Sequence, residues 1–288
     1  MSSAKILLCV TKTRYEERRI YDYLLQKGAE VDILLDSMDF PQDTIGDYQL
    51  GIIRSLSHSK SIERALYLQL FGIRTLNTYS VIHICNNKLV QSISFQRYGL
   101  PVPMFRIGSS YNSLREDFSR FSTGMIIKPL SSSWGRGIAR IMTSHELEAW
   151  IAAMESTDLH GISLPVLLQE NINKGNSDIR VVVVGKDPIV AFRRITNDSW
   201  KTNTHLGSNI EVIDLRNETP LLSLVSRLTE VLGQGIYGLD FLYDHTSGKY
   251  MICEVNHNPE FALSWKIHGV DVAEYIADEA IRQIGGEL

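Results

Sequence analysis

Short runs of apolar residues alternate with amphipathic segments over the first 80 residues of the chain. A short apolar run bounded by turn residues predicts a buried strand, and apolar residues spaced three or four apart predict a helix. The predicted strands are 6–10, 31–35 and 50–53, and the predicted helices are 16–27 and 62–71. Each helix is followed by a glycine, the residue that most often ends a helix. Strands that alternate with helices indicate a parallel α/β sheet.

The hydrophobic pattern changes after residue 80. Residues 81–100 predict one helix that ends at Gly99, and Pro101 and Pro103 then impose an extended linker. A smaller α/β unit follows, with a predicted strand at 125–129 and a predicted helix at 144–155.

From about residue 165 the chain is rich in predicted strands, which fall at 166–170, 179–184, 189–193, 237–243 and 250–255. Helices are predicted at 221–232 and 272–284. We therefore expect an α/β (α+β) protein with three units. These are an N-terminal parallel α/β domain (1–82), a small central α/β domain (83–164) and a C-terminal strand-rich domain (165–288).

The composition is that of a globular protein, with 288 residues, 44% of them hydrophobic, and a net charge of −4. The chain has no overall positive charge, so nucleic acid is not favoured as a partner. No stretch approaches the roughly 18 to 20 apolar residues of a membrane span. Cys9, Cys85 and Cys253 are odd in number and have apolar neighbours, so we interpret them as reduced thiols of a cytoplasmic protein.

Two carboxylates and an amide fall in register on a predicted hairpin near the C-terminus. Glu254 and Asn256 are two residues apart on one strand and therefore share a face. A short loop would pair Asp244 with Tyr250 and place Asp240 opposite Glu254. Hard oxygen donors of this kind suit magnesium. A solvent-exposed acidic face explains the spacing equally well, although the apolar neighbours favour a buried hairpin, where carboxylates need a cation.

Other candidate groups are weak individually. Lys128 ends a strand and precedes a loop of small residues that includes Ser132 and Gly135, which could direct backbone N–H groups at phosphates or form an ordinary surface loop. Arg193 and Arg194 lie side by side on a strand and must point to opposite faces, so that one can be buried and the other solvated. Lys88 is an unremarkable helix lysine taken alone.

The order of these groups along the chain resembles that of the ATP-grasp superfamily, and within it the RimK/LysX group. The similar strings are SWGRGIAR, SDIRVVVVG, FRRI, WKTNT and CEVNHNPEF. The resemblance covers nearly the whole chain, and it implies an ATP-grasp fold.

The resemblance also implies roles for individual residues. Those near the nucleotide would be Lys88, Lys128, Ser132 and Gly135 at the phosphates, Gln169, Glu170, Asn171 and Ile172 at adenine, Asp178 at the ribose, and Lys201, Thr202 and Asn203 close by. Asp240, Glu254 and Asn256 would bind two magnesium ions. Arg193 or Arg194 would act on the acyl phosphate or the substrate, and Asn258 would contact the substrate.

The function implied by the resemblance is ATP- and Mg²⁺-dependent ligation of a carboxylate to an amine. The partners would be a small acidic carrier protein resembling LysW and an acidic amino acid, either α-aminoadipate or glutamate. The string NHNPEF combines features of the LysX and ArgX types and leaves both amino acids open. The alternatives are a RimK-type ligase that adds glutamate to a protein, peptide or cofactor tail, and a nucleotide-binding regulatory module without catalysis. The oligomeric state is open, and a homo-oligomer is compatible with the resemblance.

Overall fold

The computed structural model describes residues 3–132, 135–156, 164–196, 200 and 209–285. Its N-terminal part is a parallel four-stranded sheet in the order β2-β1-β3-β4. The strands are β1 (Lys5–Val10), β2 (Glu30–Leu35), β3 (Leu50–Arg54) and β4 (Arg74–Leu76). A single-turn helix, η1 (Ile45–Asp47), precedes β3. The predicted parallel α/β arrangement is confirmed.

Two helices pack on this sheet, α1 (Tyr15–Gln26) and α2 (His58–Leu70). α1 begins and ends close to its predicted limits, and it buries Ile20 and Leu24 one turn apart. α2 begins four residues before the predicted start. The Ser57 side chain accepts a hydrogen bond from the backbone N–H of Lys60, which stabilises a helix start at His58.

The prediction of a single helix over residues 81–100 is wrong. The structure has two helices, α3 (Tyr79–Cys85) and α4 (Lys88–Arg97). Asn87 separates them because its backbone is extended and its side chain accepts hydrogen bonds from the backbone N–H groups of Leu89 and Val90. This break makes Lys88 the first residue of α4.

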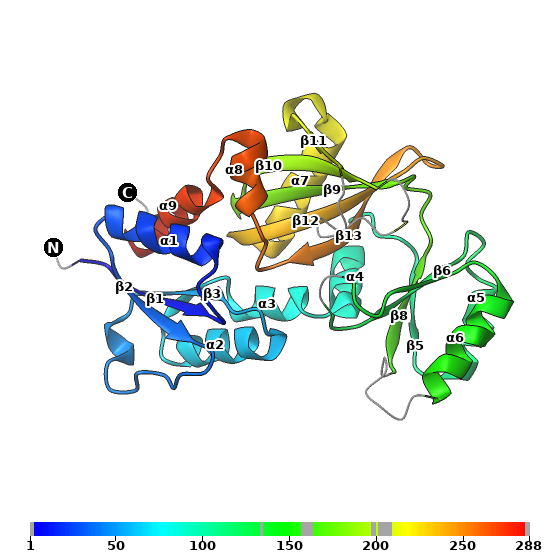
Figure 1. Cartoon of the computed structure of the whole chain (residues 1–288), viewed down its shortest axis with the longest axis horizontal. Coiled ribbons are helices and arrows are strands. Elements are labelled where there is room, and N and C mark those ends of the chain that lie inside the picture. Colours follow the sequence, from blue (N-terminus) through cyan, green and yellow to red (C-terminus); the bar gives the residue numbers. More distant parts are fainter. Residues whose placement is uncertain (1–2, 133–134, 157–163, 197–199, 201–208, 286–288) are drawn as a thin grey trace.

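The central sheet is antiparallel, with the order β5-β8-β6-β7. Its strands are β5 (Phe105–Gly108), β6 (Met125–Pro129), β7 (Ala139–Ile141) and β8 (Val166–Glu170). α5 (Tyr111–Phe118) and α6 (Ser144–Ser156) cover one face (Figure 1). The sequence grouped 166–170 with the later strands, but β8 pairs with β5 and β6. A short apolar run carries no information about its pairing partner.

The third sheet is antiparallel and five-stranded, in the order β11-β10-β9-β12-β13. Its strands are β9 (Ser177–Gly185), β10 (Asp187–Ile195), β11 (Asn209–Val212), β12 (Gly235–Asp244) and β13 (Lys249–Asn256). The short helix η3 (Leu215–Asn217) leads into α7 (Thr219–Leu232). The apolar face of α7 packs on this sheet together with residues of α3 and α4.

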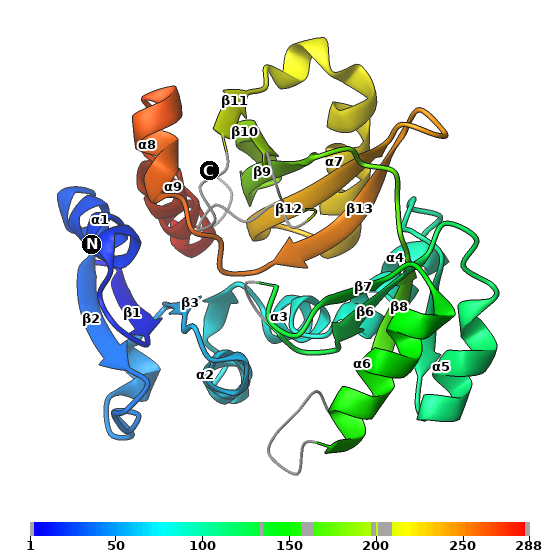
Figure 2. The same cartoon turned by 45° about the vertical axis from the view of Figure 1, so that its right-hand side comes forward.

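The chain ends with α8 (Ala262–His268) and α9 (Val272–Gly285). α9 contacts α1, β3 and β9 (Figures 1 and 2). One core cluster therefore contains Ile6 and Leu50 of the parallel sheet, Val182 of the five-stranded sheet and Ile276 of α9. The division at residues 82 and 164 stays a proposal. None of the described helices is long and apolar enough to cross a membrane.

Candidate active site

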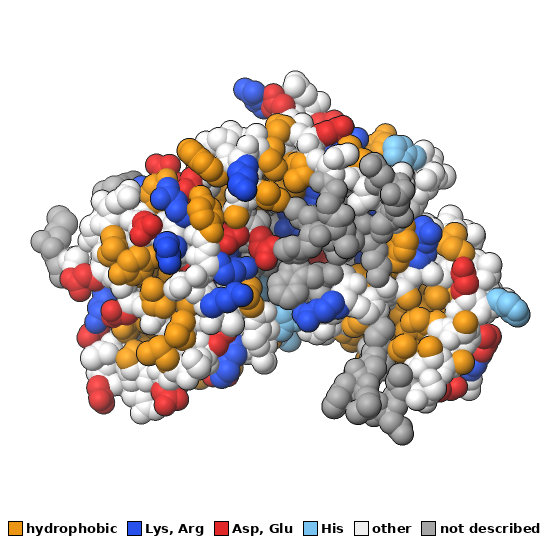
Figure 3. Space-filling view, viewed as in Figure 1, with side chains coloured by type: hydrophobic (Ala, Val, Ile, Leu, Met, Phe, Trp, Pro, Cys, Tyr) orange, Lys and Arg blue, Asp and Glu red, His pale blue; other side chains and the backbone are white. Residues whose placement is uncertain are grey.

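A cavity of about 680 Å³ lies where the three sheets meet. Its lining comes from the loops that follow β1 and β3, from the ends of β6 and β8, and from β9, β10, β12 and β13 with the segment that follows them. In the space-filling view, basic and acidic side chains gather around the middle of this face (Figure 3). The cavity lining itself includes the charged side chains Lys128, Arg194 and Asp240.

The predicted hairpin triad is brought together in this cavity. Asp240 lies directly opposite Glu254, as the sequence predicted, and the Nδ2 atom of Asn256 lies 3.4 Å from Oδ2 of Asp240. The hairpin itself differs by one residue, since Asp244 pairs with Lys249 and not with Tyr250. A bulge between Asp240 and Phe241 compensates for this shift.

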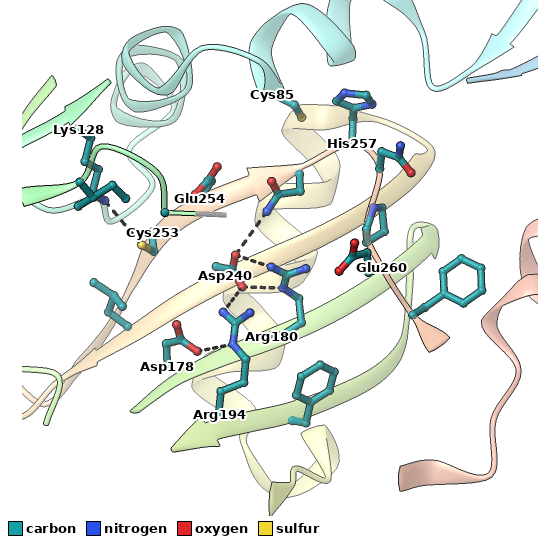
Figure 4. Close-up of a pocket in the computed structure, with 18 of the residues that line it drawn as sticks. Cys85, Lys128, Asp178, Arg180, Arg194, Asp240, Cys253, Glu254, His257 and Glu260 are labelled. Atoms are coloured by element: carbon teal, nitrogen blue, oxygen red, sulfur yellow. Dashed lines mark hydrogen bonds and ion pairs between the residues drawn. The ribbon is translucent and has the colours of Figure 1, made fainter. Parts of the chain in front are cut away.

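Two arginines hold the Asp240 carboxylate (Figure 4). Arg180 donates to both of its oxygens, at 2.6 and 2.7 Å, and Nη2 of Arg194 donates to Oδ1 at 2.7 Å. Nε of Arg194 also donates to Asp178 at 2.6 Å. Burial alone would raise the pKa of Asp240, but the two guanidinium groups hold that pKa below its usual value. The carboxylate therefore stays ionised although it is buried.

The adjacent arginines have different surroundings, as their alternation predicted. Arg194 lines the cavity and is buried. Arg193 shares a strand face with Ala191, which packs in the core beneath α7, and it is absent from the cavity lining. Asp178, predicted at the ribose, lies in the cavity against Arg194. Arg180 was not among the predicted site residues, although its two-residue spacing from Asp178 places both on one face.

The two predicted lysines come from different elements, and Lys88 contacts the triad. Lys88, at the start of α4, donates to the backbone oxygen of Ser132 at 2.7 Å and lies 3.2 Å from Oε1 of Glu254. Lys128, at the end of β6, donates to Oε1 of Gln169 and lies 3.9 Å from Sγ of Cys253.

The loop after β6 contributes Gly135, which lines the cavity with a φ of +68°. The same loop is held from the N-terminal side, where Nδ1 of His58 lies 2.6 Å from Oγ of Ser131. The Oγ atom of Ser132 is buried and has no hydrogen-bond partner among the described residues.

The predicted adenine segment lines the opposite end of the cavity with Gln169, Glu170, Asn171 and Ile172. The backbone N–H of Glu170 donates to the carbonyl of Met104, and that of Asn171 donates to the carbonyl of Gly124. These bonds fix the segment after the sheet pairing of β8 ends. Apolar side chains of Ile126, Ile138 and Leu242 also line the cavity.

Asn258, predicted at the substrate, lies in the cavity lining next to the N-terminal domain. Its Nδ2 donates to the backbone oxygens of Arg54 and Ser55, at 3.0 and 3.1 Å. The predicted residues Lys201, Thr202 and Asn203 lie outside the described part of the chain.

Sequence reasoning missed the contribution of the N-terminal unit, whose cavity-lining residues include Arg14, Glu16, Ser55 and His58. It also missed Glu260, on the segment after β13. These residues are isolated charged or polar positions in loops and at helix starts. They carry no spacing signal, because the fold brings them together from distant parts of the chain.

The protein-family model for the RimK-like ATP-grasp domain matches residues 85–280 of this chain. The chain therefore belongs to the RimK-like ATP-grasp family. The fold and family that the sequence predicted are confirmed.

The α-aminoadipate–LysW ligase LysX of Sulfurisphaera tokodaii is 28% identical over 270 residues, which is 91% of this chain and 93% of the relative. The glutamate–LysW ligase ArgX of Sulfolobus acidocaldarius is 28% identical over 277 residues, 94% of this chain and 95% of the relative. Among solved structures, a RimK-domain ATP-grasp protein from Sphaerobacter thermophilus superposes with a TM-score of 0.77 at 20% identity, covering 97% of this chain and all of that one.

Proposed function

We propose that this protein is an ATP-dependent carboxylate–amine ligase that forms an amide through an acyl phosphate. Its substrates would be the C-terminal glutamate of a small acidic carrier protein resembling LysW, and α-aminoadipate or glutamate as the amine. The observation that carries the proposal is the meeting of Asp240, Glu254 and Asn256 with two arginines in one cavity of a RimK-like chain.

The nucleotide would bind across the central and five-stranded sheets. Gln169, Glu170, Asn171 and Ile172 would contact adenine, because they line the cavity beside the apolar walls of Ile126, Ile138 and Leu242, which suit a flat heterocycle. Lys128 and the loop that contains Ser132 and Gly135 would hold the phosphates, with Lys88 beside them. The position of Gly135 in the cavity lining supports this assignment for the loop.

The donor set fits magnesium. Basic side chains lie at the cavity centre and its border, namely Lys88, Lys128, Arg180 and Arg194, beside the carboxylates of Asp178, Asp240 and Glu254. The lysines and arginines suit a polyphosphate, and the carboxylates suit the metal that accompanies it. Oδ2 of Asp240 accepts one short hydrogen bond, and Glu254 is partly exposed, so both retain lone pairs.

We propose that Asp240, Glu254 and Asn256 would hold the metal. Among the described residues, no three His, Cys, Asp or Glu side chains form a metal-binding group, so an amide oxygen is needed to complete the set. When bound, magnesium would neutralise phosphate charge and orient the γ-phosphoryl group.

The chemistry of the two substrates sets the order of the reaction, and residues of this chain can assist both steps. A carboxylate is a poor electrophile, so the donor carboxylate oxygen first attacks the γ-phosphorus of ATP, forming an acyl phosphate and releasing ADP. The amine, as the free base, then attacks the acyl carbon, the bond from that carbon to the phosphate oxygen breaks, and phosphate leaves with the electron pair. The nitrogen releases its extra proton to solvent. Arg194 and Arg180 would stabilise negative charge on the oxygens at both steps.

The test is ADP release by the purified protein with ATP, Mg²⁺, a LysW-like carrier and each candidate amino acid. We expect ADP to form with an acidic amino acid and not with lysine. We expect Glu254→Gln and Asp240→Asn to lower kcat at least about 10²- to 10³-fold, as loss of other electrostatic catalytic groups does. Glu230→Gln, at an exposed position of α7, is the matched control and should leave kcat unchanged.

The alternatives give different results in the same assay. Faster ligation of glutamate to a peptide or cofactor tail than to the carrier would favour the RimK-type alternative. Absence of ADP with every acid and amine would favour a regulatory binding module. Equal rates of ADP formation by the wild type and both variants would instead contradict the assignment of Asp240 and Glu254 to the metal.

A further inference from the structure

The cavity has a second charged end, beyond the proposed nucleotide site, which none of the roles above explains. It is formed where the loop after β1 meets the segment after β13, and its charged members are Arg14, Glu16 and Glu260. The inference drawn from it rests on the proposed function, because it concerns the amine substrate of that reaction.

Arg14 is fixed in place by a buried partner. Its Nε and Nη2 atoms donate to the two carboxylate oxygens of Glu17, at 3.0 and 2.8 Å. Burial alone would raise the pKa of Glu17, but the hydrogen bond from Arg14 and the charge of Arg54 lower it overall. Glu17 therefore remains an anion that sets the plane of the Arg14 guanidinium.

The remaining edge of Arg14 carries a carboxylate that can be exchanged. Nη1 of Arg14 donates to Oε1 of Glu260 at 3.2 Å, and the Glu260 side chain is 42% exposed. Figure 4 shows Glu260 among the cavity-lining side chains, on the segment that follows β13. Glu260 is the more exposed member of this ion pair, so it is the partner that a substrate carboxylate can replace.

This end can receive an ammonium group as well as a carboxylate. Arg14 and Arg54 are already paired with Glu17, and Glu16 lines the cavity at the same end. A substrate carboxylate that displaces Glu260 from Arg14 replaces one anion by another and leaves the charge beside Arg14 unchanged. An amino acid adds an ammonium group as well, and the buried carboxylate of Glu16 can accept hydrogen bonds from it.

Two further polar atoms at this end support a ligand. Oδ1 of Asn258 and Oγ of Ser264 are buried, belong to cavity-lining residues and have no hydrogen-bond partner among the described residues. Buried polar atoms without partners are uncommon, and a bound molecule is one explanation for them.

We propose that Arg14 binds a carboxylate of the amino-acid substrate, which reacts only through its amine, and that Glu260 occupies this position until the substrate displaces it. The reacting carboxylate of the other substrate has a separate place, beside Arg180 and Arg194, because it must receive the phosphoryl group. Arg14 is thus a specificity-determining residue for the amine substrate.

The test compares steady-state constants of variants. Arg14→Gln should raise KM for the amino acid about 10- to 100-fold, the loss expected for a charge-assisted hydrogen bond. KM for ATP and KM for the carrier should stay within about twofold, well below the tenfold change that 1.4 kcal/mol produces. Arg18→Gln, at an exposed position of α1, is the matched control and should change none of these constants.

Two other measurements keep the test informative if Arg14→Gln folds poorly. Glu260→Gln weakens the internal competitor without touching Glu17, so KM for the amino acid should fall. Analogues in which one carboxylate of the amino acid is a carboxamide should have a raised KM with the wild type. For the analogue that lacks the carboxylate bound by Arg14, the ratio of its KM to that of the amino acid should be smaller in Arg14→Lys than in the wild type.

The outcomes separate this inference from the proposed function. With AMPPNP present, calorimetry measures amino-acid binding without turnover, so a weaker Kd for Arg14→Gln supports the inference even if no ligation is found. An unchanged KM and Kd for the amino acid in Arg14→Gln would overturn it, as would a raised KM for the carrier alone or a raised amino-acid KM in Glu260→Gln. An inactive wild type would count against the proposed function only.

Discussion

At the scale of the residue, charged side chains in this protein are buried in pairs. Arg54 is almost fully buried, and its guanidinium lies 3.1 Å from Oε1 of Glu17 and donates to the carbonyl of Pro259. Arg194 has a comparable place between Asp178 and Asp240. Removal of one member of such a pair leaves an uncompensated charge, which costs about 3–5 kcal/mol. Asp240→Ala would therefore weaken the fold as well as the reaction, contrary to a purely catalytic role.

Glu17→Gln tests the structural importance of a buried carboxylate outside the proposed metal site. We expect the free energy of unfolding to fall by about 3–5 kcal/mol at pH 7, because Arg54 keeps its charge without a counterion. The folded-state pKa of Glu17 lies below its unfolded value. Its contribution is therefore full at neutral pH and is lost as the pH falls through the folded pKa.

Urea unfolding of the wild type and of Glu17→Gln between pH 7 and pH 3 measures this difference. The difference in the free energy of unfolding between the two proteins should be largest at neutral pH. It should become smaller in acid, below the usual glutamate pKa of about 4.3. Glu63→Gln, at an exposed position of α2, serves as the control and should differ little from the wild type at any pH. A difference that stays constant with pH would contradict the ionised pair.

At the scale of the element, local interruptions of regular structure position the site. The extended backbone at Asn87 ends α3 and makes Lys88 the first residue of α4, within reach of Glu254. The bulge after Asp240 restores the pairing with Glu254 although the hairpin is shifted by one residue. In both cases hydrophobic periodicity predicts the elements and misses the irregularity, because one backbone conformation does not alter the pattern of apolar residues.

Asn87→Ala tests the importance of the break between α3 and α4. The loss of two hydrogen bonds to backbone N–H groups should lower stability by about 0.5–2 kcal/mol. It should also raise KM for ATP, because Lys88 is no longer fixed beside Ser132 and Glu254. Thermal unfolding and steady-state kinetics measure the two effects.

Ser110→Ala is the matched control, since Ser110 caps α5 in the central unit. A similar loss of stability with an unchanged KM for ATP is expected there. If both variants behaved alike in the kinetics, the break would have no special role in the site.

At the scale of the whole molecule, α9 joins the two ends of the chain. Ile276 and Ala277 of α9 are buried in one cluster with residues of the parallel sheet and of the five-stranded sheet. The central sheet has a separate core, which includes Leu147 and Leu168. The cavity lies between these units, so its width depends on their packing.

Matched cavity-creating variants test this arrangement. Ile276→Ala and Leu147→Ala should each lower stability by about 2–5 kcal/mol, as deletion of buried methyl groups does. In Ile276→Ala, amide hydrogen exchange should accelerate in both β1 and β9. In Leu147→Ala it should accelerate mainly in β6, β7 and β8. Faster amide hydrogen exchange in β1 but not in β9 of the Ile276→Ala variant would contradict a shared core.

The sequence by itself determined the type and approximate limits of most elements, because apolar periodicity reflects burial directly. It also predicted that Asp240 faces Glu254, but the hairpin register it assumed was shifted by one residue, and the bulge after Asp240 restores the pairing. The tertiary structure alone decided that β8 joins the central sheet and that the segment after β13 packs against the loop after β1. It likewise decided that Arg14, Glu16 and Glu260 share one cavity. Such contacts join residues far apart in the chain, and they depend on the packing of several elements at once, which no local pattern records.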